Sequence, residues 1–216
     1  MLREKIYELK NWKLAVHTTW NPGAENVMRI HLVPPRFLSG KIVPSVVILN
    51  GQEIVPVSEA WAILLTEFIR RINQYANHAI EEKEVQQVLK ETFGAVRKIY
   101  PKTDPEVFRR DLSVMLDTFE DVIAGKIPQM EIAGISLGEY APYMRAPHRM
   151  DLMVSAMTRE GKWHCNQKCI HCYAAGQPLS EEQELDTESW KKIIRACRKA
   201  GITQLTFTGG EPTLRD

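Results

Sequence analysis

The sequence has little of several residue classes, and each shortage excludes a class of protein. Only 4 of the 216 residues are cysteine and three of them are clustered, which argues against a disulfide framework and for a reducing, cytoplasmic environment. The formal net charge is +1, so charge gives no reason to expect nucleic acid or an anionic membrane as a partner. The longest apolar run, residues 60–65, is too short to cross a bilayer, and residues 1–5 do not begin a signal peptide.

The cysteine cluster is the first motif that carries chemistry. Cys165, Cys169 and Cys172 occur in the run CNQKCIHC. Three thiolates at this spacing can hold an iron-sulfur cluster, and because a cubane has four irons, one iron is left without a protein ligand. A metal site with a free position is typical of a reactive centre rather than a purely structural one.

The second motif is Gly209-Gly210-Glu211-Pro212, directly after a predicted strand over residues 202–208. A glycine pair after a strand is often only a turn. Here one predicted helix separates it from the cysteines, and glycines at a strand end let the backbone approach a ligand closely.

In this order the two motifs resemble the radical S-adenosylmethionine (radical SAM) family, whose CxxxCxxC pattern follows the first barrel strand. The run TFTGGEPTL is similar to the family's segment after the second strand, and the resemblance covers about residues 150–216. It implies a 4Fe-4S cluster whose open iron is chelated by S-adenosylmethionine (SAM). The cluster ligands implied are Cys165, Cys169 and Cys172.

The same resemblance implies roles for the SAM-contacting residues. Gly209 and Gly210 would give backbone access, Glu211 would accept a hydrogen bond from the SAM ammonium, and Pro212 would stiffen the turn. The family usually has an aromatic residue against the SAM adenine just before the third cysteine. This sequence has His171 there, and its planar imidazole can take that place.

The activity implied is reductive cleavage of SAM to a 5′-deoxyadenosyl radical that abstracts hydrogen from a substrate, with an electron donor of the flavodoxin or ferredoxin type. The substrate would be a peptide or protein being modified, or alternatively a small metabolite. A third hypothesis is a non-catalytic module in which zinc staples the cysteine loop, with His164 or His171 as a further ligand. Zinc motifs favour paired CxxC halves, however, and the fourth cysteine, Cys197, lies on the apolar face of a predicted helix as a small buried hydrophobe.

The elements around the motifs predict a βαβ unit. A strand over residues 151–157 precedes the cysteines, and a helix capped by Asp186 or Thr187 ends at Gly201 before the strand over 202–208. A right-handed crossover would place both motifs at the carboxyl ends of neighbouring strands. The fold class expected is α/β, the start of a partial (β/α) barrel. Because a full barrel needs ~250 residues, the chain reads as truncated, and this fragment alone is expected to be inactive.

Residues 1–126 predict a separate α+β domain. Strands over 12–19 and 27–33, joined by a turn at residues 21–23, precede a hairpin around Asn50-Gly51. Three helices follow, the first capped by Ser58 and the third by Thr103 or Asp104. This order is similar to the winged-helix recognition elements of peptide maturases, which bind a leader peptide as an added strand; the exposed hairpin edge would be its place. The alternative is a packing domain with no ligand of its own. Residues 127–149 are expected to be a linker, and residues 150–216 the N-terminal portion of the barrel.

Overall fold

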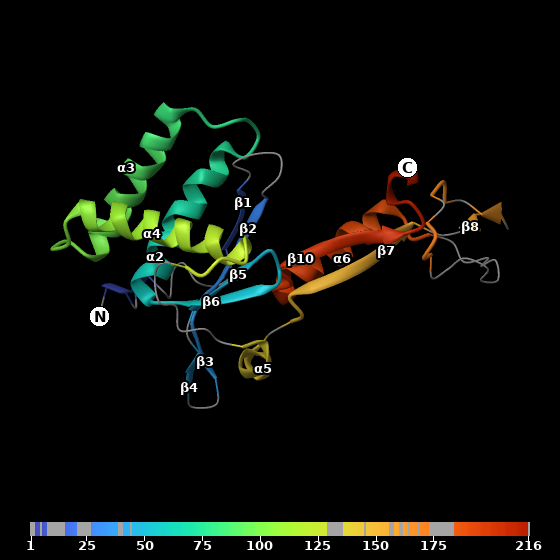
Figure 1. The fold of residues 1–216 in the computed structure, drawn as a ribbon, viewed down its shortest axis with the longest axis horizontal. Coiled ribbons are helices and arrows are strands. Elements are labelled where there is room, and N and C mark those ends of the chain that lie inside the picture. The colour runs from blue at the N-terminus through green and yellow to red at the C-terminus, as the bar shows by residue number, and fades with distance from the viewer. Residues whose placement is uncertain are drawn as a thin grey trace. The chain divides into compact units, whose positions relative to one another are not determined.

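The computed structural model of the chain describes residues 3–4, 6–7, 16–20, 27–38, 41–43, 45–128, 136–144, 146–155, 158–159, 162–163, 165–167, 169–172 and 184–215. The chain divides into two compact units, Met1–Met144 and Arg145–Asp216. The described residues form a mixed α/β structure without a closed barrel (Figure 1). The partial barrel and the winged-helix likeness stay predictions.

The first unit is built on a four-stranded antiparallel sheet with the strand order β1-β2-β5-β6. Its strands are β1 (Val16–Trp20), β2 (Met28–Val33), β5 (Ser45–Leu49) and β6 (Glu53–Val57). Every residue of β5 is buried, because both faces of this central strand are covered. That is why residues 45–49 lack the alternation of a strand with one wet face. The end strands are β1 and β6, and β6 carries Pro56.

The predicted hairpin around Asn50-Gly51 is confirmed. Asn50 and Gly51 both have positive φ angles, 51° and 73°, as a type I′ turn requires. The N–H of Gln52 donates to the carbonyl of Leu49 at 3.0 Å, and the Asn50 side chain accepts from the N–H of Arg29 on β2 at 2.8 Å. The turn therefore also fixes β5 against β2. The turn predicted at residues 21–23 lies outside the described residues.

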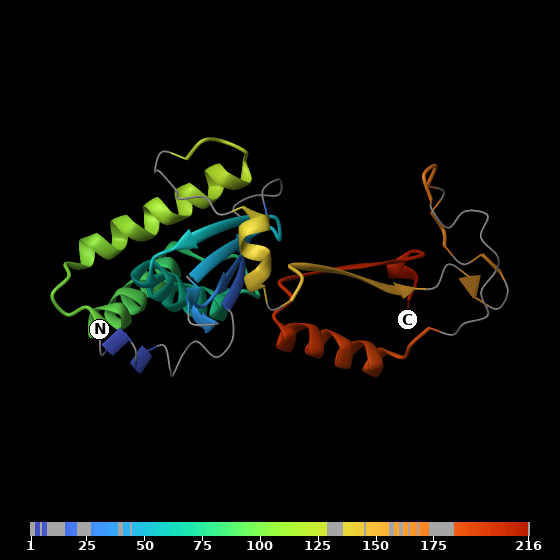
Figure 2. The ribbon, with the colours of Figure 1, turned by 90° about the horizontal axis from the view of Figure 1, so that it is seen from below.

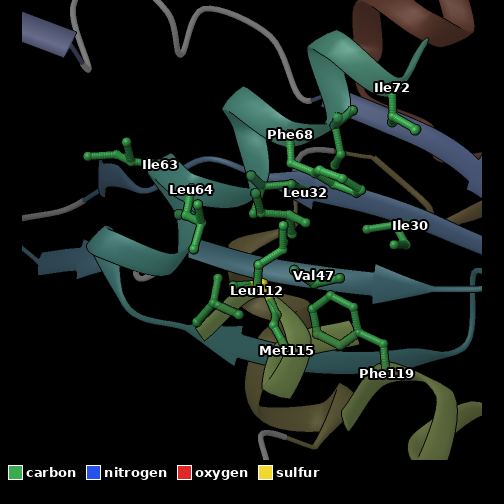
Figure 3. Packing of buried hydrophobic residues seen from close by; sticks show 14 of the residues in the cluster. Ile30, Leu32, Val47, Ile63, Leu64, Phe68, Ile72, Leu112, Met115 and Phe119 are labelled. Atoms are coloured by element: carbon green, nitrogen blue, oxygen red, sulfur yellow. The ribbon is translucent and has the colours of Figure 1, made fainter. Parts of the chain in front are cut away.

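Three helices share one core with one face of this sheet, and Figure 3 shows side chains of the first and third helix packing on β2 and β5. The helices are α2 (Glu59–Ile72), α3 (Glu82–Ile99) and α4 (Pro105–Ile123), with a 3-10 turn, η1 (Asn73–Tyr75), after α2. Ser58 caps α2 by accepting from the N–H of Trp61, and Asp104 caps α4, as predicted. The core between the helices and the sheet contains fully buried residues from both, including Ile30, Val47, Leu65, Met115 and Phe119.

The other face of the sheet is covered by a short helical segment, α5 (Leu137–Tyr140) and η2 (Ala141–Tyr143). Tyr140 is buried with Val46 and Ile48, and Tyr143 and Met144 pack against the same cluster. The last part of the expected linker therefore packs on the sheet of the first unit. A small hairpin that sequence patterns did not predict, β3 (Arg36–Leu38) with β4 (Lys41–Val43), completes the described strands of this unit.

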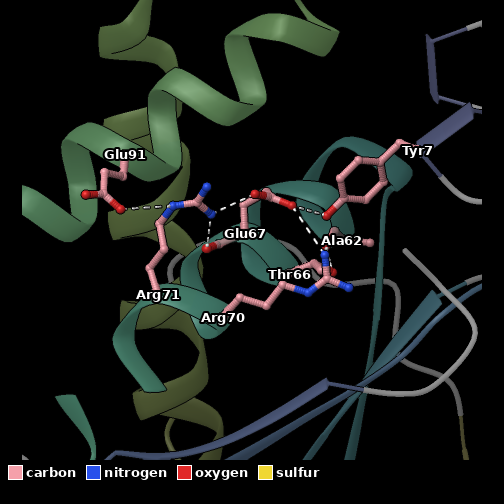
Figure 4. A network of polar contacts seen from close by, with 7 residues as sticks. All are labelled: Tyr7, Ala62, Thr66, Glu67, Arg70, Arg71 and Glu91. Carbon is pink, nitrogen blue, oxygen red and sulfur yellow. Dashed lines mark hydrogen bonds and ion pairs between the residues drawn. The ribbon is translucent and has the colours of Figure 1, made fainter. Parts of the chain in front are cut away.

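A polar network fixes the start of the chain against α2 and α3 (Figure 4). The Tyr7 hydroxyl donates to the Glu67 carboxylate at 2.5 Å, and Arg71 binds the other carboxylate oxygen at 2.6 Å. Arg71 also lies 3.7 Å from Glu91 on α3. Burial, followed by the neighbouring carboxylate, raises the pKa of Tyr7 far above its usual range, so its hydroxyl stays a donor.

The second unit is one βαβ unit with short additions. Its parallel strands are β7 (Arg149–Ser155) and β10 (Gln204–Gly209), and α6 (Thr187–Ala200) connects them and lies along one side of the pair (Figure 2). A small hairpin lies between β7 and the cysteines. Its two strands, β8 (Thr158–Arg159) and β9 (Lys162–Trp163), have two residues each. The 3-10 turn η3 (Pro212–Leu214) follows β10.

Candidate functional site

The βαβ unit forms where sequence chemistry predicted it. Asp186 caps α6 by accepting from the N–H of Ser189 at 2.6 Å, and this hydrogen bond holds the pKa of Asp186 below its ordinary value. Gly201 ends the helix with a φ of 94°, a left-handed conformation that favours glycine. Cys197 is buried, 3.7 Å from the sulfur of Met150 on β7, which confirms its predicted role as a small core residue.

The strands are parallel, with Gln204 paired with Arg149 and Thr208 with Met153. At the amino end, the carbonyl of His148 accepts from the N–H of Gln204 and from the Thr203 hydroxyl. Burial lowers the pKa of His148, and this residue lies at the end opposite the two motifs. Both motifs therefore follow the carboxyl ends of their strands, where open α/β sheets bind ligands.

Gly209 has a packing role that sequence reasoning did not identify. The strand register shifts between Thr208 and Gly209, and Gly209 has a φ of 126°. A Cβ atom there would lie 2.0 Å from the carbonyl oxygen of Ser155, so no other residue fits without moving the backbone. The N–H of Gly210 donates to that same carbonyl at 3.0 Å. The glycine pair is therefore wrapped around the end of β7, and its predicted contact with a ligand stays a prediction.

Glu211 is held in an ionised state at the start of η3. Its carboxylate accepts from the N–H of Thr213 at 3.0 Å and from the Thr213 hydroxyl at 2.7 Å. These hydrogen bonds lower its pKa below the ordinary value of 4.5, and the Gln167 side chain has a smaller effect in the same direction. Pro212 is the first residue of η3, where its fixed φ suits the turn. Gln167 lies between the first two cysteines, so the cysteine loop comes near Glu211.

The three clustered cysteines are free thiols on one loop. Cys165 and Cys172 are partly buried and Cys169 is exposed. The N–H of Cys172 donates to the carbonyl of Cys169 at 3.2 Å, which makes a turn with the exposed His171 inside it. Among the described residues, no group of three or more histidine, cysteine, aspartate or glutamate side chains is gathered as a metal site. His164 lies outside the described residues.

Accessible thiols without disulfide partners suit iron-sulfur chemistry, because soft thiolates are its preferred protein ligands. The donor set of this loop therefore fits a cluster by its chemistry.

Two further residues near the motifs were missed by sequence reasoning, Gln167 and Arg215. Arg215 donates to the carbonyls of Val154 and Leu185 and binds the carboxylate of Glu184. Glu184 is 31 residues away in sequence, and no short-range pattern links such a pair. The available signal was that Arg215 and Glu184 both flank predicted elements.

Comparison with known proteins gives matches to the part of the second unit that carries the two motifs. Residues 164–216 match the family model of the radical SAM superfamily. Enzymes of this superfamily use a 4Fe-4S cluster and S-adenosylmethionine. This match does not favour the zinc-stapled module.

Individual relatives match the same part of the chain. Over 64 residues the chain is 42% identical to the Fe-coproporphyrin III synthase of Methanosarcina barkeri, covering 30% of this chain and 15% of that protein. Over 51 residues it is 37% identical to a probable GTP 3′,8-cyclase of Methanopyrus kandleri, covering 24% and 16%. The chain thus spans about a sixth of the length of these radical SAM relatives.

A comparison with solved structures gave no significant match. None of the described helices combines the length and apolar character that a bilayer-spanning helix needs.

Proposed function

We propose that this chain carries the cofactor-binding end of a radical SAM enzyme. In this proposal Cys165, Cys169 and Cys172 ligate a 4Fe-4S cluster, and Glu211 accepts a hydrogen bond from the ammonium group of SAM. The single observation that supports it most is the match of residues 164–216 to the radical SAM model, because this segment contains both the cysteine loop and the Gly-Gly-Glu run.

The residues present have separate tasks. The three cysteines would hold the cluster, and a bound cluster would supply the one-electron reduction of SAM that allows hydrogen abstraction from a substrate. The cysteines bind as thiolates, so cluster assembly releases their protons. Glu211 stays ionised through the neutral pH range and can accept a charge-assisted hydrogen bond from an ammonium. Gly209 keeps the strand end close to Ser155, and His171 is assigned to the adenine by resemblance.

Two classes of substrate are compared, a peptide or protein and a small molecule. A peptide or protein substrate is supported only by the element order of the first unit. The edge that a leader peptide would extend, β6, also carries Pro56, which has no N–H to donate. The names of the two relatives refer to GTP and to coproporphyrin, which are small molecules. The reductant is proposed to be of the flavodoxin or ferredoxin type.

Anaerobic reconstitution with iron and sulfide tests the proposal. We expect a brown protein that contains iron and sulfide, and loss of most of that iron when any one of Cys165, Cys169 or Cys172 is replaced by alanine. Cys197→Ala is the matched control, because this thiol is buried against Met150 and should not affect iron content. A colourless protein that retains zinc would overturn the cluster assignment, and equal iron loss in Cys197→Ala would show the ligand set to be wrong.

A further inference from the structure

Arg215 makes three contacts that converge on one guanidinium group. One of its terminal nitrogens, Nη1, donates to the carbonyl of Val154 at 2.7 Å and lies 3.2 Å from the carboxylate of Glu184. The other, Nη2, donates to the carbonyl of Leu185. The side chains of both ion-pair partners are largely buried, with 16% of Arg215 and 22% of Glu184 exposed. Partial burial shields such a pair from solvent screening, unlike most surface ion pairs.

These three acceptors lie on the two stems of the loop that carries the cysteines. Val154 is the second-last residue of β7, on the stem that leads into the loop. Glu184 and Leu185 directly precede Asp186, the N-cap of α6, on the stem that leads out of it. One arginine therefore closes the base of the loop that contains Cys165, Cys169 and Cys172.

The segment that supplies this arginine also contains the second motif. Consecutive carbonyls at the end of β7 are both bound by it: Val154 by Arg215 and Ser155 by the N–H of Gly210. The short turn η3 joins these two points, with the N–H of Arg215 donating to the carbonyl of Pro212 at 3.2 Å. Fixing the stems of a long loop removes conformational freedom that binding would otherwise have to remove.

We propose that Arg215 is a positioning residue, which holds the cysteine loop in register with Glu211 so that SAM bound at the cluster also reaches the Glu211 carboxylate. This rests on the proposed function. A guanidinium suits the task because its planar fork serves several acceptors at once, whereas a lysine ammonium is a point charge on a flexible stem.

The test uses Arg215→Met, which keeps an apolar stem without the fork, and Arg215→Lys, which keeps the charge. Arg195→Met is the control, since Arg195 is an exposed arginine on α6 of the same unit. The readouts are amide hydrogen exchange of residues 184–186 without cofactors, iron content after reconstitution, and SAM affinity from the change in the reduced cluster's EPR spectrum.

For Arg215→Met we expect faster exchange at 184–186, near-normal iron content and a SAM dissociation constant raised about tenfold, the effect of losing hydrogen bonds to a charged group. Arg215→Lys should restore part of the affinity, and Arg195→Met should match the unsubstituted protein. If Arg215→Met does not fold, Glu184→Gln gives the same test from the partner side, with smaller changes in the same direction.

Unchanged SAM affinity would overturn the positioning role, and so would weaker affinity without faster exchange at 184–186. A loss of iron content parallel to the loss of affinity would show a merely structural role and would also overturn it. Failure of the unsubstituted protein to bind a cluster or SAM is a distinguishable result, because it would remove the proposed function itself.

Discussion

At the scale of single residues, Gly209 is the position where the structure tolerates least change. Gly209→Ala places a Cβ atom against the Ser155 carbonyl at a φ of 126°, so we expect a loss of about 2 kcal/mol or more in the stability of the second unit. Gly201→Ala is the control, because Gly201 also has a positive φ, 94°, but has nothing within 4 Å of the added atom. It should cost only the strain of the left-handed conformation, about 1 kcal/mol. Chemical denaturation of both variants decides this, and equal losses would contradict the close contact.

Glu211 gives a residue-scale prediction about ligand binding. Glu211→Gln keeps an oxygen that can accept from Thr213 but removes the charge, so SAM affinity should fall about tenfold or more while iron content is unchanged. The pKa of Glu211 is depressed below 4.5, so its carboxylate is ionised across the neutral range and loses its charge only as the pH falls through the lowered value. Its contribution to SAM affinity should therefore be flat above about pH 5. Titration of SAM against the reconstituted cluster measures both effects, and unchanged affinity would remove the role of Glu211.

At the scale of elements, the Tyr7 network predicts how firmly the start of the chain is held to α2. Tyr7→Phe removes the donor to Glu67 but leaves its contacts with Arg70 and Arg71, so the first unit should lose about 1 to 2 kcal/mol. Tyr75→Phe is the control, because the Tyr75 ring packs against the same core and beside His78, outside the Glu67 network. Denaturation followed by tryptophan fluorescence tests the pair of variants. An unchanged free energy of unfolding in Tyr7→Phe would mean that this hydrogen bond contributes nothing to stability.

Elements whose ends are set by local chemistry are also the ones that the sequence predicts. Asn50-Gly51, the Ser58 and Asp104 caps and the Gly201 terminus depend on neighbours within a few residues, and each is found where expected. The β3–β4 hairpin, the packing of Tyr140 under the sheet and the partners of Arg215 were not predictable. The last two depend on contacts between distant segments, for which a single sequence carries no periodic signal. The β3–β4 hairpin is local, but its three-residue strands are too short to show an alternating pattern.

The candidate site also has features that follow local sequence patterns and features that depend on contacts between distant segments. The spacing of Cys165, Cys169 and Cys172 and the Gly-Gly-Glu run are local patterns, and they pointed to the segment that matches the radical SAM superfamily. What they could not show is that Gly209 is required by the Ser155 carbonyl. This requirement arises only when β7 and β10 pair with a shifted register.

At the scale of the whole molecule, the two units should differ in protection from hydrogen exchange. The first has a core of sheet and three helices, whereas the second has two paired strands whose outer edges are unpaired within the described residues. We expect slow exchange through β2, β5 and α2, and fast exchange through β10 when this chain is studied alone. Mass spectrometry of deuterated peptides measures both. Strong, uniform protection of residues 204–209 in a monomer would show that the βαβ unit is stable without further strands.

Pro56 limits how copies of the first unit could associate through their sheets. Of the two end strands, β6 has a proline in its middle and cannot present an unbroken row of donors, whereas β1 contains no proline. Edge-to-edge growth into an open fibre needs two usable edges on each copy, one for each neighbour. Within the described part of this sheet β1 is the one end strand without a proline, so pairing through it joins two copies about a twofold axis and then stops.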